Sequence, residues 1–235
     1  MDINDLYDHN YVPYSEKASA AVVRSKSGQW FPGICVENLC YPLSISATQN
    51  ALFYCLSEGH QPAELFTDEI NASMMPSWEK EFGFKANPLE GNDLQNITFE
   101  NPVLDADINK MEQLKQLLDM AVVGESDFPV SAIVETEQGY FTGVNIECSS
   151  WDMGLCAERV AIAKALTFGS DQLISLEIHT RKGEFSSPCG ACRQVIIEHL
   201  PKKQIHLHHA DDSESIHFSE DLLPHSFSST SLSNR

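Results

Sequence analysis

The sequence predicts an α/β fold built from two similar units. A chain of 235 residues can form two domains of about 100 residues each. The chain also matches itself at a spacing of 110 residues, so that Gly33 recurs as Gly143 and Glu37 recurs as Glu147. In each copy, two β-branched and apolar stretches joined by a glycine-containing turn are followed by a helical stretch. Strands and helices therefore alternate in each unit, which is typical of α/β proteins.

The individual elements can be placed by their patterns. Apolar residues at helical spacing predict a helix between 108 and 123, and good helix formers with a terminal glycine predict another over 154–169. Residues 61–105 contain several prolines and many polar side chains and give the weakest pattern. Within them, 75–82 is similar to a degenerate copy of the helix that begins near Cys189. The two strand pairs are predicted at 20–23 with 29–36 and at 131–135 with 140–147.

Three cysteines and one glutamate of the second unit form a candidate zinc site. Cys156 begins a Cys-Ala-Glu sequence that contains Glu158, and Cys189 and Cys192 belong to a Pro-Cys-Gly-Ala-Cys sequence. Three thiolates leave the fourth position of a tetrahedral zinc open, as in a catalytic site. Both motifs begin predicted helices, where free N–H groups and the helix dipole favour thiolates. We therefore predict one Zn²⁺ per chain, bound in the second unit, with Glu158 beside it as a proton carrier.

With these motifs, the second unit resembles the cytidine deaminase family. The matching segments lie between Phe128 and Gln194 and include Gly-Val-Asn-Ile-Glu, Cys-Ala-Glu-Arg and Pro-Cys-Gly-Ala-Cys-Arg-Gln. The resemblance implies two three-layer α/β/α units, each a mixed β-sheet flanked by helices. It also implies zinc-dependent hydrolytic deamination of cytidine and 2′-deoxycytidine to uridine and 2′-deoxyuridine, with release of ammonia, in pyrimidine salvage. The preference between ribose and deoxyribose stays open.

The resemblance also assigns roles to individual residues. In the implied reaction, zinc hydroxide attacks C4 of the base while Glu158 shuttles protons to N3 and to the departing amino group. Asn145 and Glu147 alternate on a predicted strand, so both face one side, and they are implied to bind the ribose hydroxyls. Phe128 is implied to pack beside the base. Ala157 is implied to offer its backbone to the pyrimidine carbonyl.

Two further residues have implied roles around the site. Arg159 adjoins the cysteines, and the resemblance implies that it donates hydrogen bonds to the thiolate sulfurs, which restores Lewis acidity to the metal. Phe227 matches a C-terminal phenylalanine that reaches into a neighbouring subunit's site in the family. Its alternative role is that of a plain hydrophobic anchor.

The first copy lacks the chemistry of the second. Ser46 and Thr48 stand at the positions of the first zinc ligand and of the catalytic glutamate, and the second cysteine pair has no counterpart. We predict a degenerate, zinc-free domain over 1–105 and a catalytic domain over 106–235. The two-domain form in the family implies a homodimer with four deaminase-like units and two zinc sites.

Composition limits the partners and the location. The net charge of −19, with acidic residues in excess in both halves, disfavours a nucleic acid polymer or an anionic membrane surface but not a neutral nucleoside. No apolar run approaches the roughly 20 residues of a membrane span. The N-terminus lacks the pattern of a secretory signal, and the seven cysteines are odd in number. A cytoplasmic protein without a disulfide framework is expected.

Two rival functions remain open at this stage. The first keeps the chemistry but changes the substrate to a nucleotide, a modified nucleoside or a polynucleotide, for which basic residues near the site are expected and are scarce here. The second is a non-catalytic protein stabilised by zinc. Such a protein would not need Glu158, which the second unit retains.

Overall fold

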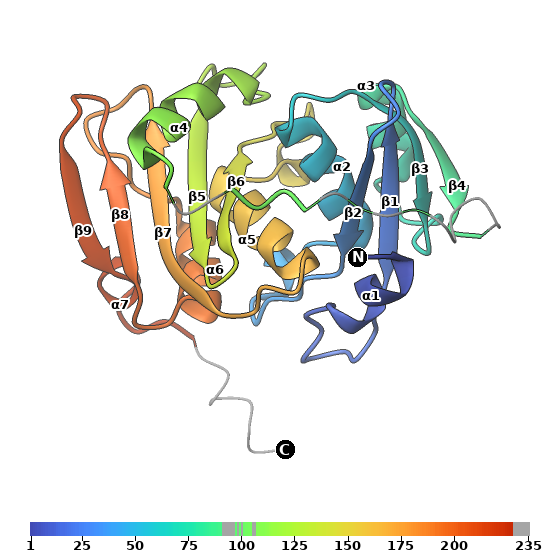
Figure 1. The fold of residues 1–235 in the computed structure, drawn as a ribbon, viewed down its shortest axis with the longest axis horizontal. Coiled ribbons are helices and arrows are strands. Elements are labelled where there is room, and N and C mark those ends of the chain that lie inside the picture. Colours follow the sequence, from blue (N-terminus) through green and yellow to red (C-terminus); the bar gives the residue numbers. More distant parts are fainter. Residues whose placement is uncertain (91–96, 98, 100, 105–106, 228–235) are drawn as a thin grey trace.

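The chain folds into two mixed β-sheets that stand side by side with helices between them (Figure 1). Each sheet is antiparallel except for one parallel strand pair, and each belongs to one of the two copies. The arrangement confirms the predicted α/β class with mixed sheets flanked by helices. The computed structural model describes residues 1–90, 97, 99, 101–104 and 107–227.

The first unit has strand order β2-β1-β3-β4, with β3 and β4 parallel. The β1–β2 hairpin turns at Gly28, whose positive φ of 92° favours glycine. The predicted degenerate helix over 75–82 is confirmed as α3, which connects β3 to β4. The elements are α1 (Ile3–Asp8), β1 (Ala20–Ser25), β2 (Trp30–Ile34), a 3₁₀ turn (Tyr41–Leu43), α2 (Ala47–Ser57), β3 (Pro62–Thr67), α3 (Met75–Phe82) and β4 (Lys85–Pro88).

The second unit repeats this order and adds an edge strand, giving β6-β5-β7-β8-β9. Here α6 connects the parallel pair β7 and β8, as α3 connects β3 and β4. The elements are α4 (Lys110–Leu117), a 3₁₀ turn (Leu118–Met120), β5 (Val130–Thr136), β6 (Gly139–Val144), a 3₁₀ turn (Trp151–Met153), α5 (Ala157–Thr167), β7 (Leu173–Thr180), α6 (Gly190–His199), β8 (Gln204–His208), β9 (Glu214–Phe218) and α7 (Ser219–Leu222).

The predicted strand pairs and helices are confirmed, with shifted ends. β6 stops at Val144, so Asn145 and Glu147 lie just beyond the strand on which they were expected. The predicted domain boundary between 105 and 106 lies outside the described residues. Among the described residues, no helix has the length and apolar character needed to cross a membrane.

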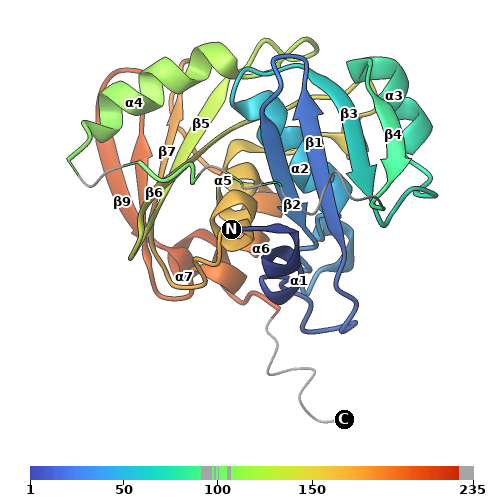
Figure 2. The ribbon, with the colours of Figure 1, turned by 45° about the vertical axis from the view of Figure 1, so that its right-hand side comes forward.

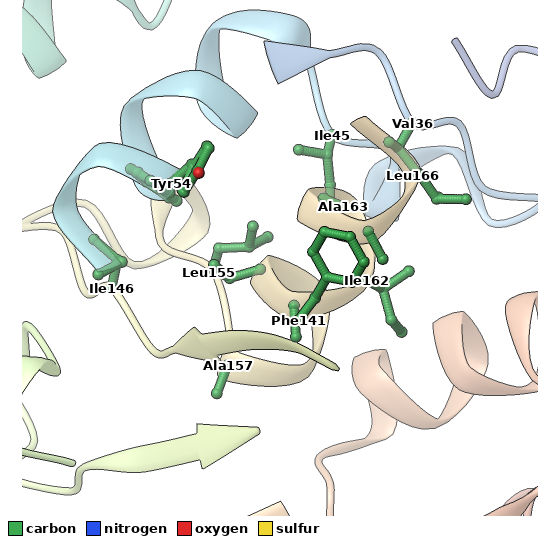
Figure 3. Close-up of a cluster of buried hydrophobic side chains, with 14 of the residues drawn as sticks. Val36, Ile45, Tyr54, Phe141, Ile146, Leu155, Ala157, Ile162, Ala163 and Leu166 are labelled. Carbon is green, nitrogen blue, oxygen red and sulfur yellow. The ribbon is translucent and has the colours of Figure 1, made fainter. Parts of the chain in front are cut away.

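Helices α2 and α5 form the middle layer and bury each other between the sheets (Figures 1 and 2). Every residue of both helices is buried, because each helix packs against the sheet of its own unit and against the other helix. Figure 3 shows the resulting core, in which Ile45 of the first unit lies near Ile162 and Ala163 of α5. A single hydrophobic core thus joins the two units.

A charged residue of α5 crosses this core to the first unit. The side chain of Lys164 is only 1% exposed, and its ammonium pairs with the carboxylate of Glu58 at the end of α2. The same ammonium lies 4.8 Å from the ring centroid of Tyr54 and 3.4 Å from Thr142 Oγ1. Glu58 therefore neutralises a charge that the core would otherwise leave isolated.

Removing only one partner of this pair should be costly. We expect Glu58→Ala to lower the free energy of unfolding by about 2 kcal/mol, less than for a fully buried pair because part of Glu58 is exposed. Lys164→Met, which removes the buried charge itself, should stay within about 1 kcal/mol of wild type. Urea unfolding of both variants measures this difference. Equal losses would show that the charge is solvated in another way.

Candidate metal centre and substrate contacts

The three cysteines of the second unit meet at the ends of two helices. Cys156 and Cys189 are the N-cap residues of α5 and α6, and their sulfur atoms lie 3.7 Å apart. All three sulfurs, including that of the buried Cys192, lie within 4.8 Å of one another. Cys156 was expected in the first turn of α5, whereas the structure places it one residue before the helix. Cys189 Sγ accepts an N–H of its own helix end, whereas Cys156 makes no side-chain bond to the start of α5.

The environment favours a negative charge on one of these thiols, that of Cys189. The hydrogen bond to Cys189 raises the pKa of Cys156, and hydrogen bonds to Cys156 and Cys189 raise the pKa of Cys192. Hydrogen bonds from the Cys156 and Cys192 thiols, together with backbone N–H groups of Ala191 and Cys192, hold the pKa of Cys189 well below its usual value. The Cys192 N–H lies 3.5 Å from Cys189 Sγ. A helix N-terminus that stabilises a thiolate is a suitable place for a metal ligand.

Glu158 lies in the first turn of α5, beside the thiol cluster. Its side chain is only 3% exposed, and its Oε2 is buried without a hydrogen-bond partner among the described residues. This burial raises the pKa of Glu158 to about 7. A carboxyl group with a pKa near neutrality can both accept and release a proton, which is what general acid–base catalysis requires.

This set of groups fits a catalytic zinc ion. Three clustered thiols supply the soft ligands that zinc prefers, and they leave one coordination position for another molecule. The unpartnered oxygen of Glu158 gives the site one polar atom that the protein does not satisfy. Glu158 therefore suits a molecule that binds next to the metal.

Asn145 and Glu147 both form hydrogen bonds with the segment that leads into β5. Asn145 Oδ1 accepts the Val130 N–H at 2.8 Å, and its Nδ2 donates to the Phe128 carbonyl at 3.0 Å. Glu147 Oε2 accepts the N–H of Ser126 at 3.0 Å. These bonds fix the backbone that carries Phe128, so both side chains have a structural role that the sequence did not predict.

Arg159 reaches across to the first unit. Its Nη2 donates to the carbonyl of Leu43 at 2.8 Å, while its Nε is buried and has no partner within the described part of the chain. Within the described residues, no hydrogen bond joins Arg159 to the sulfurs, so its expected role there stays a prediction. Gln49, which stands at the Arg159 position of the first copy, donates in return to the carbonyl of Met153 at 3.1 Å. The two contacts are therefore equivalent: in each, the side chain from one unit donates to the backbone carbonyl at the matching position of the other unit.

Arg193 is a site residue that sequence reasoning missed. Its Nε donates to the Pro188 carbonyl at 2.9 Å, and its Nη1 donates to the Leu222 carbonyl at 3.2 Å. It thereby holds the loop before Cys189 against the C-terminal helix α7. The sequence signal that could have identified Arg193 is its position directly after Cys192 in the Pro-Cys-Gly-Ala-Cys-Arg run. The ring of Phe227 is half exposed, and its carbonyl accepts from Gln194 at 3.5 Å.

Among the described residues, the corresponding place in the first unit holds no cluster of metal-ligating side chains. Ser46 caps α2 as Cys156 caps α5, and Thr48 Oγ1 is hydrogen-bonded to Thr67 Oγ1 at 2.8 Å. The carboxylate of Glu69 accepts the N–H of Thr48 at 3.0 Å. A protein carboxylate therefore stabilises this helix end, where the second unit uses thiols.

A second group of metal-binding side-chain types lies on the outer face of β7, β8 and β9. Glu177 is bonded through one oxygen to Lys110 Nζ at 2.8 Å and through the other to His208 Nε2 at 2.6 Å. Glu214 is bonded to His206 at 2.7 Å. These groups already satisfy one another, so they form an ion-pair network that fastens α4 to the sheet.

Comparison with known proteins gives matches for both units. A model of the cytidine and deoxycytidylate deaminase zinc-binding region matches residues 105–207, and a second model with the same description matches residues 5–75. The chain is 35% identical to a cytidine deaminase of Mycoplasma genitalium over 114 residues, which are 48% of this chain and 88% of the relative. It is 33% identical to a cytidine deaminase of Halalkalibacterium halodurans over 122 residues, which are 51% of this chain and 92% of the relative.

Solved structures include a similar protein. The crystal structure of a cytidine deaminase from Burkholderia pseudomallei matches with a TM-score of 0.47 and 32% identity. The match covers 49% of this chain and 94% of that protein.

Proposed function

The chain belongs to the cytidine and deoxycytidylate deaminase family, and we propose that it is a zinc-dependent enzyme that deaminates cytidine and 2′-deoxycytidine. The products are uridine or 2′-deoxyuridine and ammonia, which suits pyrimidine salvage. The buried, unpartnered Oε2 of Glu158 beside three clustered thiols is the observation that carries this proposal. A purely structural zinc site would gain nothing from it.

Cys156, Cys189 and Cys192 would hold one zinc ion in a catalytic domain of residues 106–235. When bound, zinc supplies the Lewis acidity that makes water a nucleophile near neutral pH. Glu158 Oε2 would take one proton from the attacking water and pass it to N3 of the base. It would then take the second proton from the same oxygen, as the C4 carbonyl forms, and deliver it to the leaving amino group.

The remaining residues bind and orient the nucleoside. The Asn145 amide exchanges hydrogen bonds with the sugar hydroxyls and the Glu147 carboxylate accepts from them, in addition to fixing the loop that carries Phe128. The Phe128 ring packs beside the base, and the backbone of Ala157 meets the pyrimidine carbonyl. Arg159, whose Nε has no partner among the described residues, would donate a hydrogen bond to the thiolate sulfurs.

Turnover and metal content, measured together, test this function. The wild-type protein should contain one zinc per chain and should remove the cytosine absorbance of both nucleosides, and Cys192→Ser should lose zinc and turnover together. The ratio of kcat/KM for the two nucleosides gives the sugar preference. A zinc-loaded wild type that leaves both nucleosides unchanged, or that accepts only deoxycytidylate, would contradict the proposal.

We propose a cytoplasmic homodimer with the degenerate domain, residues 1–105, as its scaffold. All seven cysteines are free, which suits a reducing compartment. Trp151 is 89% exposed and Tyr41 is 68% exposed, and they occupy equivalent positions in the two units. Large exposed aromatic side chains favour a protein interface at both places, and Phe227 is a further candidate for contact with the second subunit.

The interface can be tested with one substitution per unit. Sedimentation of the wild type should give twice the mass of one chain. Tyr41→Ser combined with Trp151→Ser should shift the equilibrium toward monomer by about 2 kcal/mol or more. The exposed Ile174→Ser, on another surface, serves as the control and should remain dimeric. A double variant as dimeric as wild type would place the interface elsewhere.

A further inference from the structure

The last turn of α6 is held by the inactive first unit. Glu198 Oε1 accepts hydrogen bonds from the hydroxyls of Tyr14 at 2.8 Å and Tyr11 at 3.2 Å, and its Oε2 accepts the Leu39 N–H at 2.8 Å. The Tyr11 ring also contacts the imidazole of His199 edge-on, with centroids 4.8 Å apart. Three donors from one unit thus converge on a single carboxylate of the other.

Part of this arrangement recurs in the opposite direction. Glu81 of α3 accepts the N–H of Ser149 at 2.6 Å and its hydroxyl at 3.0 Å. Ser149 is the counterpart of Leu39 at the spacing of 110 residues, and α3 is the counterpart of α6. Each unit therefore receives a carboxylate from the connecting helix of the other.

The two tyrosine hydroxyls, however, occur on one side only. Tyr11 bridges to Val36 as Val122 bridges to Ile146, so Val122 takes the place of Tyr11 in the second unit. By the same alignment, Glu125 takes the place of Tyr14. The stronger clamp is thus built on α6, which carries Cys189 and Cys192, and not on α3, which carries no cysteine.

We propose that Glu198 is a positioning residue for the metal centre and that Tyr11, Tyr14 and the Leu39 backbone act through it. Because α6 is a rigid helix of ten residues, fixing its last turn fixes the direction of its axis and hence the place of the thiols at its start. The hydrogen bond from Arg159 to the Leu43 carbonyl fixes the position of α5 against the same unit. The first unit therefore sets the geometry between the two helices that supply the ligands. This inference rests on the proposed zinc site.

Two conservative substitutions test the clamp with a matched control. Tyr14→Phe removes one hydroxyl, and Glu198→Gln weakens all three bonds without changing the size of the side chain. Tyr7→Phe is the control, since the Tyr7 hydroxyl makes the same kind of bond, to Asp68 at 2.7 Å, within the first unit. All are made in the full chain, and release of zinc to a chelating dye and the absorption spectrum of the Co²⁺-substituted protein are recorded with kcat and KM.

The two clamp variants should release zinc about tenfold faster and alter the Co²⁺–thiolate bands. Their kcat should fall about tenfold, while KM stays near the wild-type value because no proposed substrate contact changes. Tyr7→Phe should leave zinc release, spectrum and kcat unchanged. If the clamp variants match Tyr7→Phe in zinc release and spectrum, the proposal is wrong. A wild type that holds zinc without turning over cytidine would contradict the proposed reaction alone, because zinc release would still decide the clamp.

Discussion

Glu158→Gln should lower kcat by about 10³- to 10⁴-fold while the protein keeps its fold and one zinc per chain. The amide has the shape of the carboxylate but cannot take up a proton from water at neutral pH. It would also place an N–H₂ donor or a neutral carbonyl where the native side chain offers an unpartnered, buried oxygen. The loss is therefore expected in the chemical step, and KM should change much less than kcat.

A second glutamate at a helix N-terminus provides the comparison. Glu69 accepts the N–H of Thr48 at the start of α2, so Glu69→Gln makes the same chemical change in the first unit. The kcat of the Glu69→Gln protein should stay within about twofold of wild type, even if the free energy of unfolding of this variant falls. Rates must be measured together with zinc content, and in a single turnover. A Glu158→Gln protein that keeps one zinc and more than a tenth of the wild-type rate would rule out the proton-carrier role.

Much of the candidate metal centre could be predicted because its parts are local in the sequence. The Cys-Ala-Glu and Pro-Cys-Gly-Ala-Cys motifs each fix the start of one helix, so the types of ligand and their N-terminal positions follow from spacing alone. The predicted convergence of Cys156 with Cys189 agrees with the 3.7 Å between their sulfurs. The internal repeat likewise gave the strand order of each hairpin and the location of α3.

Contacts between the units could not be predicted, because they depend on how two sheets and two helices pack. The bond from Arg159 to Leu43 joins residues far apart in the sequence, and a lone arginine near cysteines gives no sign of it. The contacts of Glu198 with the first unit could not be predicted either, because the sequence shows only a glutamate in a helix. Asn145 and Glu147 were expected on a strand, yet their bonds to a neighbouring loop require the chain to leave the sheet at Val144.

Gly143→Ala should abolish activity and destabilise the protein by about 3 kcal/mol. A methyl group on Gly143 would lie 2.6 Å from the backbone nitrogen of Ala161 and closer still to the carbonyl oxygen of Ala157. Both are backbone atoms of α5, which cannot rotate away as a side chain can. The strand and the helix must therefore separate, and the start of α5, with Cys156 as its N-cap and Glu158 in its first turn, would move away from the thiols of α6.

Gly33→Ala separates this effect from simple loss of stability. A methyl group there would lie 2.5 Å from the Ala47 carbonyl, so the same strain arises against α2, which holds no zinc ligand. Unfolding by urea should show similar destabilisation of both variants. Zinc affinity and kcat of the folded fraction should fall sharply only in Gly143→Ala, because only α5 carries the chemistry. If both variants lost activity merely in proportion to the unfolded fraction, the close packing of β6 on α5 would matter for folding and not for the geometry of the site.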